Sequence, residues 1–368
     1  MADADVEPDV RRVRQGRARA AMAAAGADVM LLSVGADLPY FTGYEAMPLE
    51  RLTMLVVVRD ADATLVVPEL EAPRVVADPS FTVRPWPEGA DPISIVADLA
   101  HGARRVAIGD LTWTRFTLAL QDALPDAHFT PANPITSPLR SVKDAAEIDA
   151  LRHAARAVDA VAVEMRTRPF GGRTEADLSR ELVDRILEHG HQRANFAIVG
   201  SGPNGASPHH DAGDRVIEAG DVVVCDFGGT MNGYCSDTTR MFVVGAPTSE
   251  VADTYAALAE AQGRAVRAAS IGTSCAEVDA VARRSLAEHG LADAFMHRIG
   301  HGIGLEAHED PYLVAGNSTP LAAGHAFSVE PGVYFPGRFG MRLEDIVVAT
   351  AAGPESLNVS PHDLAVVE

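Results

Sequence analysis

Four carboxylates and one histidine in the C-terminal half of the sequence have the types and spacing of a two-metal hydrolase site. They are Asp226, Asp237, His301, Glu330 and Glu344. Acids gathered in one apolar cavity repel one another, and some would be forced to hold protons. Divalent cations remove this cost, and oxygen and imidazole ligands suit Mn, Co, Fe or Zn rather than copper. Two such ions can activate water and polarise a carbonyl group, so the pattern predicts hydrolysis.

The first two acids flank a predicted β-hairpin. An apolar run that ends at Asp226 reads as a buried strand, and a glycine-rich stretch separates it from Asp237. A turn centred near Met231 and Asn232 places the two acids directly opposite each other. A two-residue turn at Asn232 and Gly233 instead makes the pair diagonal. Either register keeps both acids on one face, because side chains alternate along a strand with a period of two.

The second pair of acids repeats this arrangement. A turn centred on Gly337 brings Glu330 opposite Glu344, and the alternation turns Asp345 to the other face. His301 comes from a stretch in which three flanking glycines allow close backbone packing.

Six motifs, taken in order, resemble those of the pita-bread metallopeptidases, whose members include proline dipeptidase (prolidase), Xaa-Pro aminopeptidase and methionine aminopeptidase. The motifs are Ser207-Pro-His-His210, Asp226-Phe-Gly-Gly229, Ser236-Asp-Thr-Thr-Arg240, Gly300-His-Gly-Ile-Gly-Leu-Glu-Ala-His308, Val329-Glu-Pro-Gly332 and Arg342-Leu-Glu-Asp345. The resemblance is strong over residues 143–368. The N-terminal part is similar to the smaller domain of the prolidase and aminopeptidase P branch.

The resemblance implies how two divalent metal ions, with Mn expected and Co, Zn or Fe as alternatives, are held. Asp237 and Glu344 would bridge both ions. Asp226 would complete one coordination sphere, and His301 with Glu330 would complete the other.

The same resemblance implies the catalytic roles. His308 would stabilise the oxyanion, and Glu330 would carry the proton of the attacking water to the leaving nitrogen. His209 would orient the substrate, because the family motif selects it over its neighbour His210. His210 is kept as a further candidate for substrate contact.

The expected reaction is hydrolysis of the Xaa-Pro bond of dipeptides or short peptides. Many prolidases carry a basic residue just after a His-Glu-x-Pro segment, where it helps to hold the substrate carboxylate. Here Tyr312 stands at that position, which predicts a weakened preference for dipeptides. Arg342 is the expected substitute for this substrate contact, with Arg338 as a second possibility.

Other activities stay open within the same fold. Some relatives hydrolyse ectoine-type amides or cleave sulfonium compounds with the same metals. Others are binding proteins that have lost the ligands, and creatinase works without metal. The intact set of five ligands argues against the last two possibilities.

Composition limits the partners. The 368-residue chain has 51 acidic against 31 basic residues and a net charge of −20, which disfavours nucleic acid and anionic membranes. Its three cysteines, Cys225, Cys235 and Cys275, imply no disulfide framework and fit a reducing cytoplasm. Cys225 and Cys235 lie close to proposed ligands, and thiolate ligation is the less favoured alternative.

The N-terminal region carries five arginines between Arg11 and Arg19, followed by alanines, and could imitate a signal peptide. Acidic residues precede the arginines and Asp28 interrupts the apolar stretch, so we expect a surface helix over residues 8–25 instead. No apolar run reaches membrane-spanning length.

The whole chain is predicted to be an α/β protein with a small N-terminal domain over residues 1–137 and a pita-bread catalytic domain over 138–368. In the first, alternating patterns predict strands at 28–33, 53–59, 63–68, 82–86 and 104–109 and helices at 69–77, 91–101 and 114–124. The proline-rich segment 131–138 is expected to break the pattern.

In the catalytic domain, helices are predicted at 144–166, 175–188, 250–268 and 275–289 and strands at 195–200 and 220–226. The resemblance further implies a homodimer in which the N-terminal domain of one subunit reaches the active site of the other. Residues 40–44 are expected either to belong to the core or to form a loop that lines the partner's substrate site.

Overall fold

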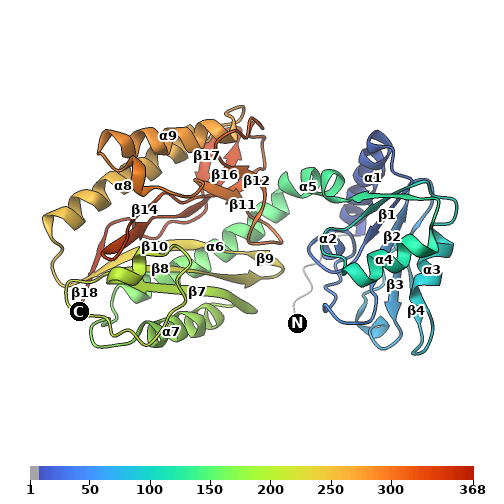
Figure 1. Ribbon diagram of the computed structural model, residues 1–368, viewed down its shortest axis with the longest axis horizontal. Helices are drawn as coiled ribbons and strands as arrows, with labels where there is room; N and C mark the ends of the chain where they lie inside the picture. The colour runs from blue at the N-terminus through green and yellow to red at the C-terminus, as the bar shows by residue number, and fades with distance from the viewer. Residues whose placement is uncertain (1–7) are drawn as a thin grey trace. The chain divides into compact units, whose positions relative to one another are not determined.

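The computed structural model describes residues 8–368, and the chain forms two compact units that divide between Arg140 and Ser141. Both units combine helices with sheets, as Figure 1 shows, so the expected α/β class is confirmed. None of the helices within the described range has the length and apolar character needed to cross a bilayer.

The first unit is built on one sheet of mixed direction. Its strands are β1 Val29–Leu32, β2 Met54–Val58, β3 Ala63–Pro68, β4 Phe81–Trp86, β5 Arg105–Ile108 and β6 His128–Pro131. Its helices are α1 Pro8–Ala25, α2 Asp37–Thr42, η1 Ala72–Arg74, α3 Pro92–Leu99, α4 Thr114–Ala123 and α5 Asn133–Ser141, which ends across the division. The sheet order is β4-β3-β2-β1-β5-β6, in which β1 pairs antiparallel with β2 and parallel with β5.

Two expectations for this unit were wrong. Residues 69–77 form one short 3-10 turn rather than a helix, because the segment is mostly exposed and buries no apolar face that could stabilise a short helix. Residues 131–138 contain most of α5 rather than a break. A proline in the first helical turn costs no hydrogen bond, and the helix also accommodates Pro138. The expected N-terminal helix is confirmed as α1.

The second unit contains the remaining elements. Its strands are β7 Arg193–Ser201, β8 Val222–Met231, β9 Tyr234–Cys235, β10 Thr238–Val244, β11 Gly300–Gly302, β12 Glu309–Leu313, β13 Ala326–Val329, β14 Gly332–Phe335, β15 Phe339–Arg342, β16 Asp345–Thr350, β17 Gly353–Ser356 and β18 Ala365–Val367. Its helices are α6 Ala145–Met165, α7 Glu175–Glu188, η2 Gly202–Ala206, α8 Ser249–Ala268, α9 Cys275–Glu288 and η3 Ala292–Ala294. Asp144 caps the start of α6, where it forms a reciprocal capping box with Glu147.

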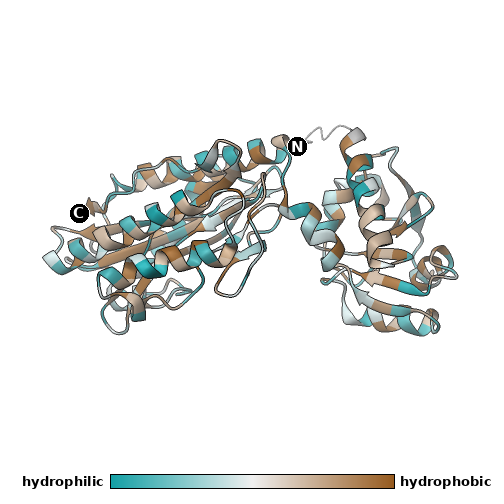
Figure 2. Cartoon of the chain, turned by 90° about the horizontal axis from the view of Figure 1, so that it is seen from above, coloured by the Kyte–Doolittle hydropathy of each residue, from teal (hydrophilic) through white to brown (hydrophobic). Residues whose placement is uncertain are grey.

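Two sheets face each other inside this unit, one in the order β18-β10-β8-β7 with β9 on β8, the other in the order β12-β11-β13-β16-β17. One apolar cluster packs α8 and α9 beside the second sheet, and another packs α6 and α7 beside the first. The strands therefore lie between layers of helices, and Figure 2 shows that they are the more apolar part. An isolated bridge between Thr239 and Glu344 links the two sheets.

Candidate active site

The first hairpin adopts the diagonal register. Met231 pairs with Tyr234, so Asn232 and Gly233 form a two-residue turn, and both have positive φ angles, 51° and 85°. Such a turn matches the twist of the flanking strands. Asp226 consequently faces Thr239, not Asp237, and the turn centred near Met231 was wrong. The two acids still share one face of the sheet, since Asp237 precedes Thr239 by two residues.

The second hairpin has the predicted register. Val329 pairs with Asp345 and Gly332 with Arg342, which places Glu330 directly across from Glu344. The turn is centred on Gly337, whose φ of 75° favours glycine.

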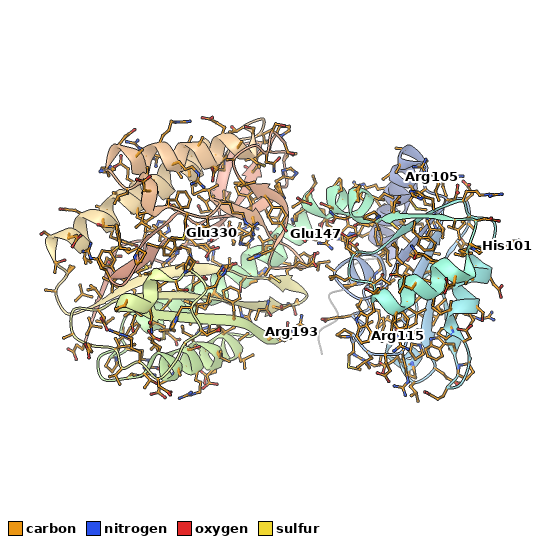
Figure 3. The ribbon with its side chains drawn as sticks, in the orientation of Figure 1. His101, Arg105, Arg115, Glu147, Arg193 and Glu330 are labelled. Carbon is orange, nitrogen blue, oxygen red and sulfur yellow. The ribbon has the colours of Figure 1, made fainter. Side chains whose placement is uncertain are left out.

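These elements bring six side chains together from separate strands and loops. Three groups of ligand atoms, each within 4.8 Å of one another, occur in the described part of the chain: Asp237 with His301 and His308, His301 with Glu330 and Glu344, and Asp226 with Asp237 and Glu344. His301 Nε2 lies 3.2 Å from Glu330 Oε1 and 3.8 Å from Asp237 Oδ2. Glu330, labelled in Figure 3, lies in the interior of the unit.

The carboxylates present oxygens that a cation would satisfy. Asp226 Oδ1, Asp237 Oδ1 and Glu344 Oε1 are buried without a hydrogen-bond donor. Burial raises the pKa of Asp237 and of Glu344 well above the usual range, and the neighbouring carboxylates add to both shifts. A buried oxygen without a partner is costly, and cations are what satisfies a converging set of them. The residues present therefore fit divalent metal ions.

The Nε2 of His301 is turned toward the acids. Its Nδ1 lies 3.1 Å from the carbonyl oxygen of Gly302, which can only accept, so Nδ1 carries a hydrogen and Nε2 is left to bind a proton or a metal ion. Its main-chain N–H donates to Ser328 Oγ, which in turn donates to Glu330 at 2.9 Å. Ser328 thus couples the placement of these two neighbours. The ring of His308 lies 3.9 Å from that of His301, centroid to centroid.

A cavity of about 990 Å³ opens onto the cluster. The proposed ligands, His308 and the exposed His209 all line it. Phe196 and Ile198, two residues apart on β7, form an apolar part of its wall. A small substrate that combines an apolar ring with a polar reacting centre suits such a lining.

The remaining predicted substrate contacts lie in different places. Arg342 lines the cavity but is buried and donates to Asp226, Tyr334, Thr239 and the carbonyl of Pro208. Its guanidinium therefore links the strands and the loop of the site and is occupied by these protein acceptors.

His210 points elsewhere. Its Nε2 lies 2.7 Å from Glu175, a fully buried carboxylate that also accepts hydrogen bonds from Ser201 and Asn204. The structure therefore places His210 in an anchor for the loop that carries His209.

Two further side chains were considered for the substrate carboxylate. Tyr312 lies on β12 against the guanidinium of Arg298, 4.5 Å from ring centroid to Cζ. Arg338 is exposed and paired with Glu250, and it is not among the residues that line the cavity.

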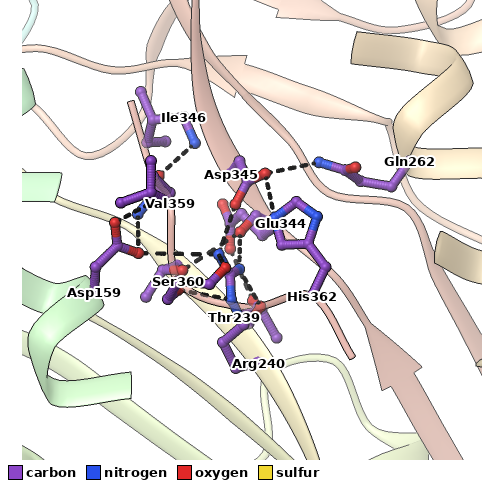
Figure 4. Close-up of polar contacts among 12 residues, drawn as sticks. Asp159, Thr239, Arg240, Gln262, Glu344, Asp345, Ile346, Val359, Ser360 and His362 are labelled. Atoms are coloured by element: carbon purple, nitrogen blue, oxygen red, sulfur yellow. Dashed lines mark hydrogen bonds and ion pairs between the residues drawn. The ribbon is translucent and has the colours of Figure 1, made fainter. Parts of the chain in front are cut away.

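A buried polar network supports the strand of Glu344 from behind. Asp345 accepts hydrogen bonds from Arg240 at 2.8 Å and Gln262 at 3.1 Å, and His362 lies 2.8 Å away (Figure 4). Arg240 also donates to the main-chain oxygen of Glu344. Asp345 thus points away from Glu344 and is held by its own polar partners, as the alternation of side chains along the strand predicted.

Neither hairpin cysteine joins the cluster. Cys225 packs in the apolar core on the opposite side of β8 from Asp226, and burial raises its pKa. Burial also raises the pKa of Cys235 to about 11. Thiolate ligation therefore has no support in this geometry.

Sequence reasoning missed three residues that shape the cavity. Arg298 and His297 line it, and Tyr334 joins His297 to Arg342 by hydrogen bonds of 2.9 and 2.8 Å. His297 and Arg298 precede the glycine-flanked His301 by four and three residues, which was the available signal.

Residues 149–351 match the model of metallopeptidase family M24, and residues 14–142 match that of the creatinase/prolidase N-terminal domain. The chain is 44% identical to "Probable dipeptidase PepE" of Mycobacterium tuberculosis over 99% of this chain and 98% of that protein. The crystal structure of dipeptidase PepE from Mycobacterium ulcerans superposes with a TM-score of 0.90 at 44% identity, covering 98% of this chain and 99% of the other. A Xaa-Pro dipeptidase from Bacillus anthracis gives 0.88 at 31% identity, covering 97% and 100%.

Proposed function

The chain belongs to metallopeptidase family M24, and we propose that it hydrolyses the Xaa-Pro bond of dipeptides or short peptides with two bound divalent metal ions. The observation that carries this proposal is the convergence of three buried, donor-free carboxylate oxygens with the Nε2 of His301 beneath an open cavity. Two relatives of this chain, named as a probable dipeptidase and a Xaa-Pro dipeptidase, support the substrate class.

The metal ligands in this proposal are Asp226, Asp237, His301, Glu330 and Glu344. Bound ions supply a nucleophile from water at neutral pH and stabilise charge on the reacting carbonyl. We propose Mn, because the donor set is four carboxylates and one imidazole, with Co, Zn or Fe as alternatives.

Three side chains of the site have the remaining roles of oxyanion stabilisation, proton transfer and substrate orientation. His308 donates a hydrogen bond to the developing oxyanion, a role that its proximity to the proposed ligand His301 supports. Glu330 would take the water proton and deliver it to the leaving nitrogen. In the metal-free protein, burial acts to raise the pKa of Glu330, but the hydrogen bond and charge of protonated His301, with the charges of His297 and Arg342, lower it to about 2. His209 orients the substrate from the cavity wall.

Proline suits the site for a simple reason. The nitrogen of an Xaa-Pro bond carries no hydrogen, so the site needs no acceptor there, and the ring requires an apolar surface. Phe196 and Ile198 provide one.

An assay of purified protein separates this function from its alternative, an amidase or lyase acting on a small ectoine-type or sulfonium compound. Ala-Pro, Ala-Ala, ectoine and dimethylsulfoniopropionate are each offered with and without Mn. The proposal requires Mn-dependent release of proline from Ala-Pro, with slower cleavage of Ala-Ala. Turnover of ectoine or the sulfonium compound without cleavage of Ala-Pro would establish the alternative.

We also propose that the protein acts as a homodimer on a proline-containing peptide, with neither nucleic acid nor membrane as a partner. Light scattering of the purified protein tests the dimer, and a single-chain mass at micromolar concentration would exclude it.

A further inference from the structure

One guanidinium group on the cavity wall is free of acidic partners. Arg298 lines the cavity and is half-buried, and within residues 8–368 its side chain forms neither an ion pair nor a hydrogen bond. An arginine at a cavity wall with its donors available is a recognition group for a carboxylate.

The position of this guanidinium is fixed by stacking. Its Cζ lies 4.5 Å from the ring centroid of Tyr312, a distance at which a cation is attracted to the aromatic face. Stacking on a ring face leaves the edge of the guanidinium, with its N–H donors, free to bind a planar anion. Tyr312 therefore acts as a platform for a cation that comes from another segment.

The neighbouring basic side chains of the cavity are already engaged. Arg342, the second arginine of the lining, is buried and donates to Asp226 and Tyr334. His297 is engaged through both ring nitrogens, with the carbonyl of Arg298 and with Tyr334. Arg298 is therefore the arginine of this wall whose donors are open to a substrate.

Arg298 also lies on the same cavity as the proposed metal ligands. It precedes His301 by three residues, and both side chains line that cavity. In a dipeptide the free carboxylate is separated from the cleaved bond by a single residue, a span of at most about 3.6 Å. A tripeptide places its carboxylate one residue further away.

We propose that Arg298, oriented by Tyr312, binds the C-terminal carboxylate of the substrate and makes the enzyme selective for dipeptides. This inference rests on the proposed function and names the specificity of the same site. It replaces the expectation, drawn from Tyr312 alone, of a weakened preference for dipeptides.

The test compares Ala-Pro with its C-terminal amide, which has the same bond and ring but no negative charge. The proteins are wild type, Arg298→Met, Arg298→Lys and Arg338→Met, all in saturating Mn. Arg338 is a matched control because it also lies over aromatic rings, Phe335 and Phe339, but outside the cavity.

Arg298→Met should lower kcat/KM for Ala-Pro by roughly ten- to a hundredfold, the range of one charge-assisted hydrogen bond. Its kcat/KM for the amide should stay within about threefold of wild type. Arg298→Lys should recover part of the loss, because it keeps the charge but not the stacked, planar fork. Arg338→Met should match wild type on both substrates.

Melting temperature and metal content show whether Arg298→Met is folded and loaded with metal. If it is not, Arg298→Lys is compared with wild type on the two substrates instead. An equal loss on both substrates in a folded, metal-loaded variant, or no loss on either, would overturn the role of Arg298. If wild type cleaves neither substrate with Mn, Co, Zn or Fe, the proposed function itself has failed.

Discussion

Glu330 lies directly across from Glu344 at the centre of the proposed metal site, yet the two carboxyl groups are biased toward opposite protonation states. Burial acts to raise the pKa of both. His301 nevertheless holds the pKa of Glu330 at about 2, whereas the charge of Glu330 adds to burial and raises the pKa of Glu344 well above its usual range. Two neighbouring acids whose pKa values are shifted in opposite directions are typical of catalytic sites. The ionised member is free to accept a proton, and the other gains a stable charged form only when a cation is present.

Asp237→Asn should lose bound metal and activity together. The amide keeps the shape of the side chain but removes the negative charge proposed to bridge both ions, so kcat/KM for Ala-Pro should fall by at least about a hundredfold. Elemental analysis and the peptidase assay measure both effects. Asp293→Asn, an exposed acid on η3, is the control and should be unchanged. Two ions per chain in Asp237→Asn would remove Asp237 from the bridging role.

Substitutions of His301 and His308 should have different effects on metal content and kcat, although the two rings are in contact. His301→Ala removes a proposed ligand and should weaken metal binding. His308→Ala should retain the metal and lower kcat by roughly 10²–10³, the usual cost of losing one oxyanion donor. Metal content measured beside kcat distinguishes the two. Identical behaviour would mean that our division between ligand and catalyst is wrong.

Substitutions of the adjacent histidines His209 and His210 should lower kcat/KM by different amounts. His209 lines the cavity, whereas His210 is hydrogen-bonded to Glu175. Glu175 keeps other hydrogen-bond donors when His210 is removed. We therefore expect His210→Ala to reduce kcat/KM by less than about tenfold and His209→Ala by clearly more. A larger effect of His210→Ala would make the Glu175 anchor, rather than His209, the decisive part of this loop.

Acid should destabilise the fold through His325. Burial and the nearby charge of Lys143 lower its pKa to about 4, and its Nδ1 accepts a hydrogen bond from the N–H of Ala322 at 3.2 Å. The ordinary pKa of histidine in an unfolded chain is about 6.5. Above that pH both states are neutral, and between about 6.5 and about 4 only the unfolded state gains the proton. The contribution to stability is thus complete above the unfolded pKa and is lost as the pH falls toward the folded pKa.

The substitution His325→Asn keeps an acceptor near the position of Nδ1 but removes the titrating group. In this variant, the decrease in unfolding free energy from pH 7 to pH 5 should be smaller than in wild type by about 2 kcal/mol. Urea unfolding of metal-free protein at the two pH values measures it. Equal decreases in both proteins would show that His325 is protonated in the folded state.

The sequence predicted that these acids converge because short hairpins set their own register. The Gly337 turn determines that Glu330 faces Glu344, and alternation alone sends Asp345 to the opposite side. For the first pair both registers were considered, and the positive φ angles of Asn232 and Gly233 decided between them. Turn chemistry, weighed more heavily, would have selected the observed register.

Arg298 was not predictable in the same way. Its relation to Tyr312 joins β12 to the segment before β11, and no local pattern specifies which side chain stacks on a ring across strands. The helix α5 was missed for a different reason: three prolines read as a break, although Pro131 precedes the helix, Pro134 lies in its first turn and Pro138 is accommodated within it. Long-range packing and tolerance at helix ends are decided by tertiary structure.

The most direct test of the account is a Mn titration of the chelator-stripped protein, followed by Ala-Pro hydrolysis. The five proposed ligands predict that activity is absent without metal and reaches its plateau at two equivalents of Mn per chain. Hydrolysis of Ala-Pro that persists in the metal-free protein, or a plateau at one equivalent, would contradict a two-metal peptidase.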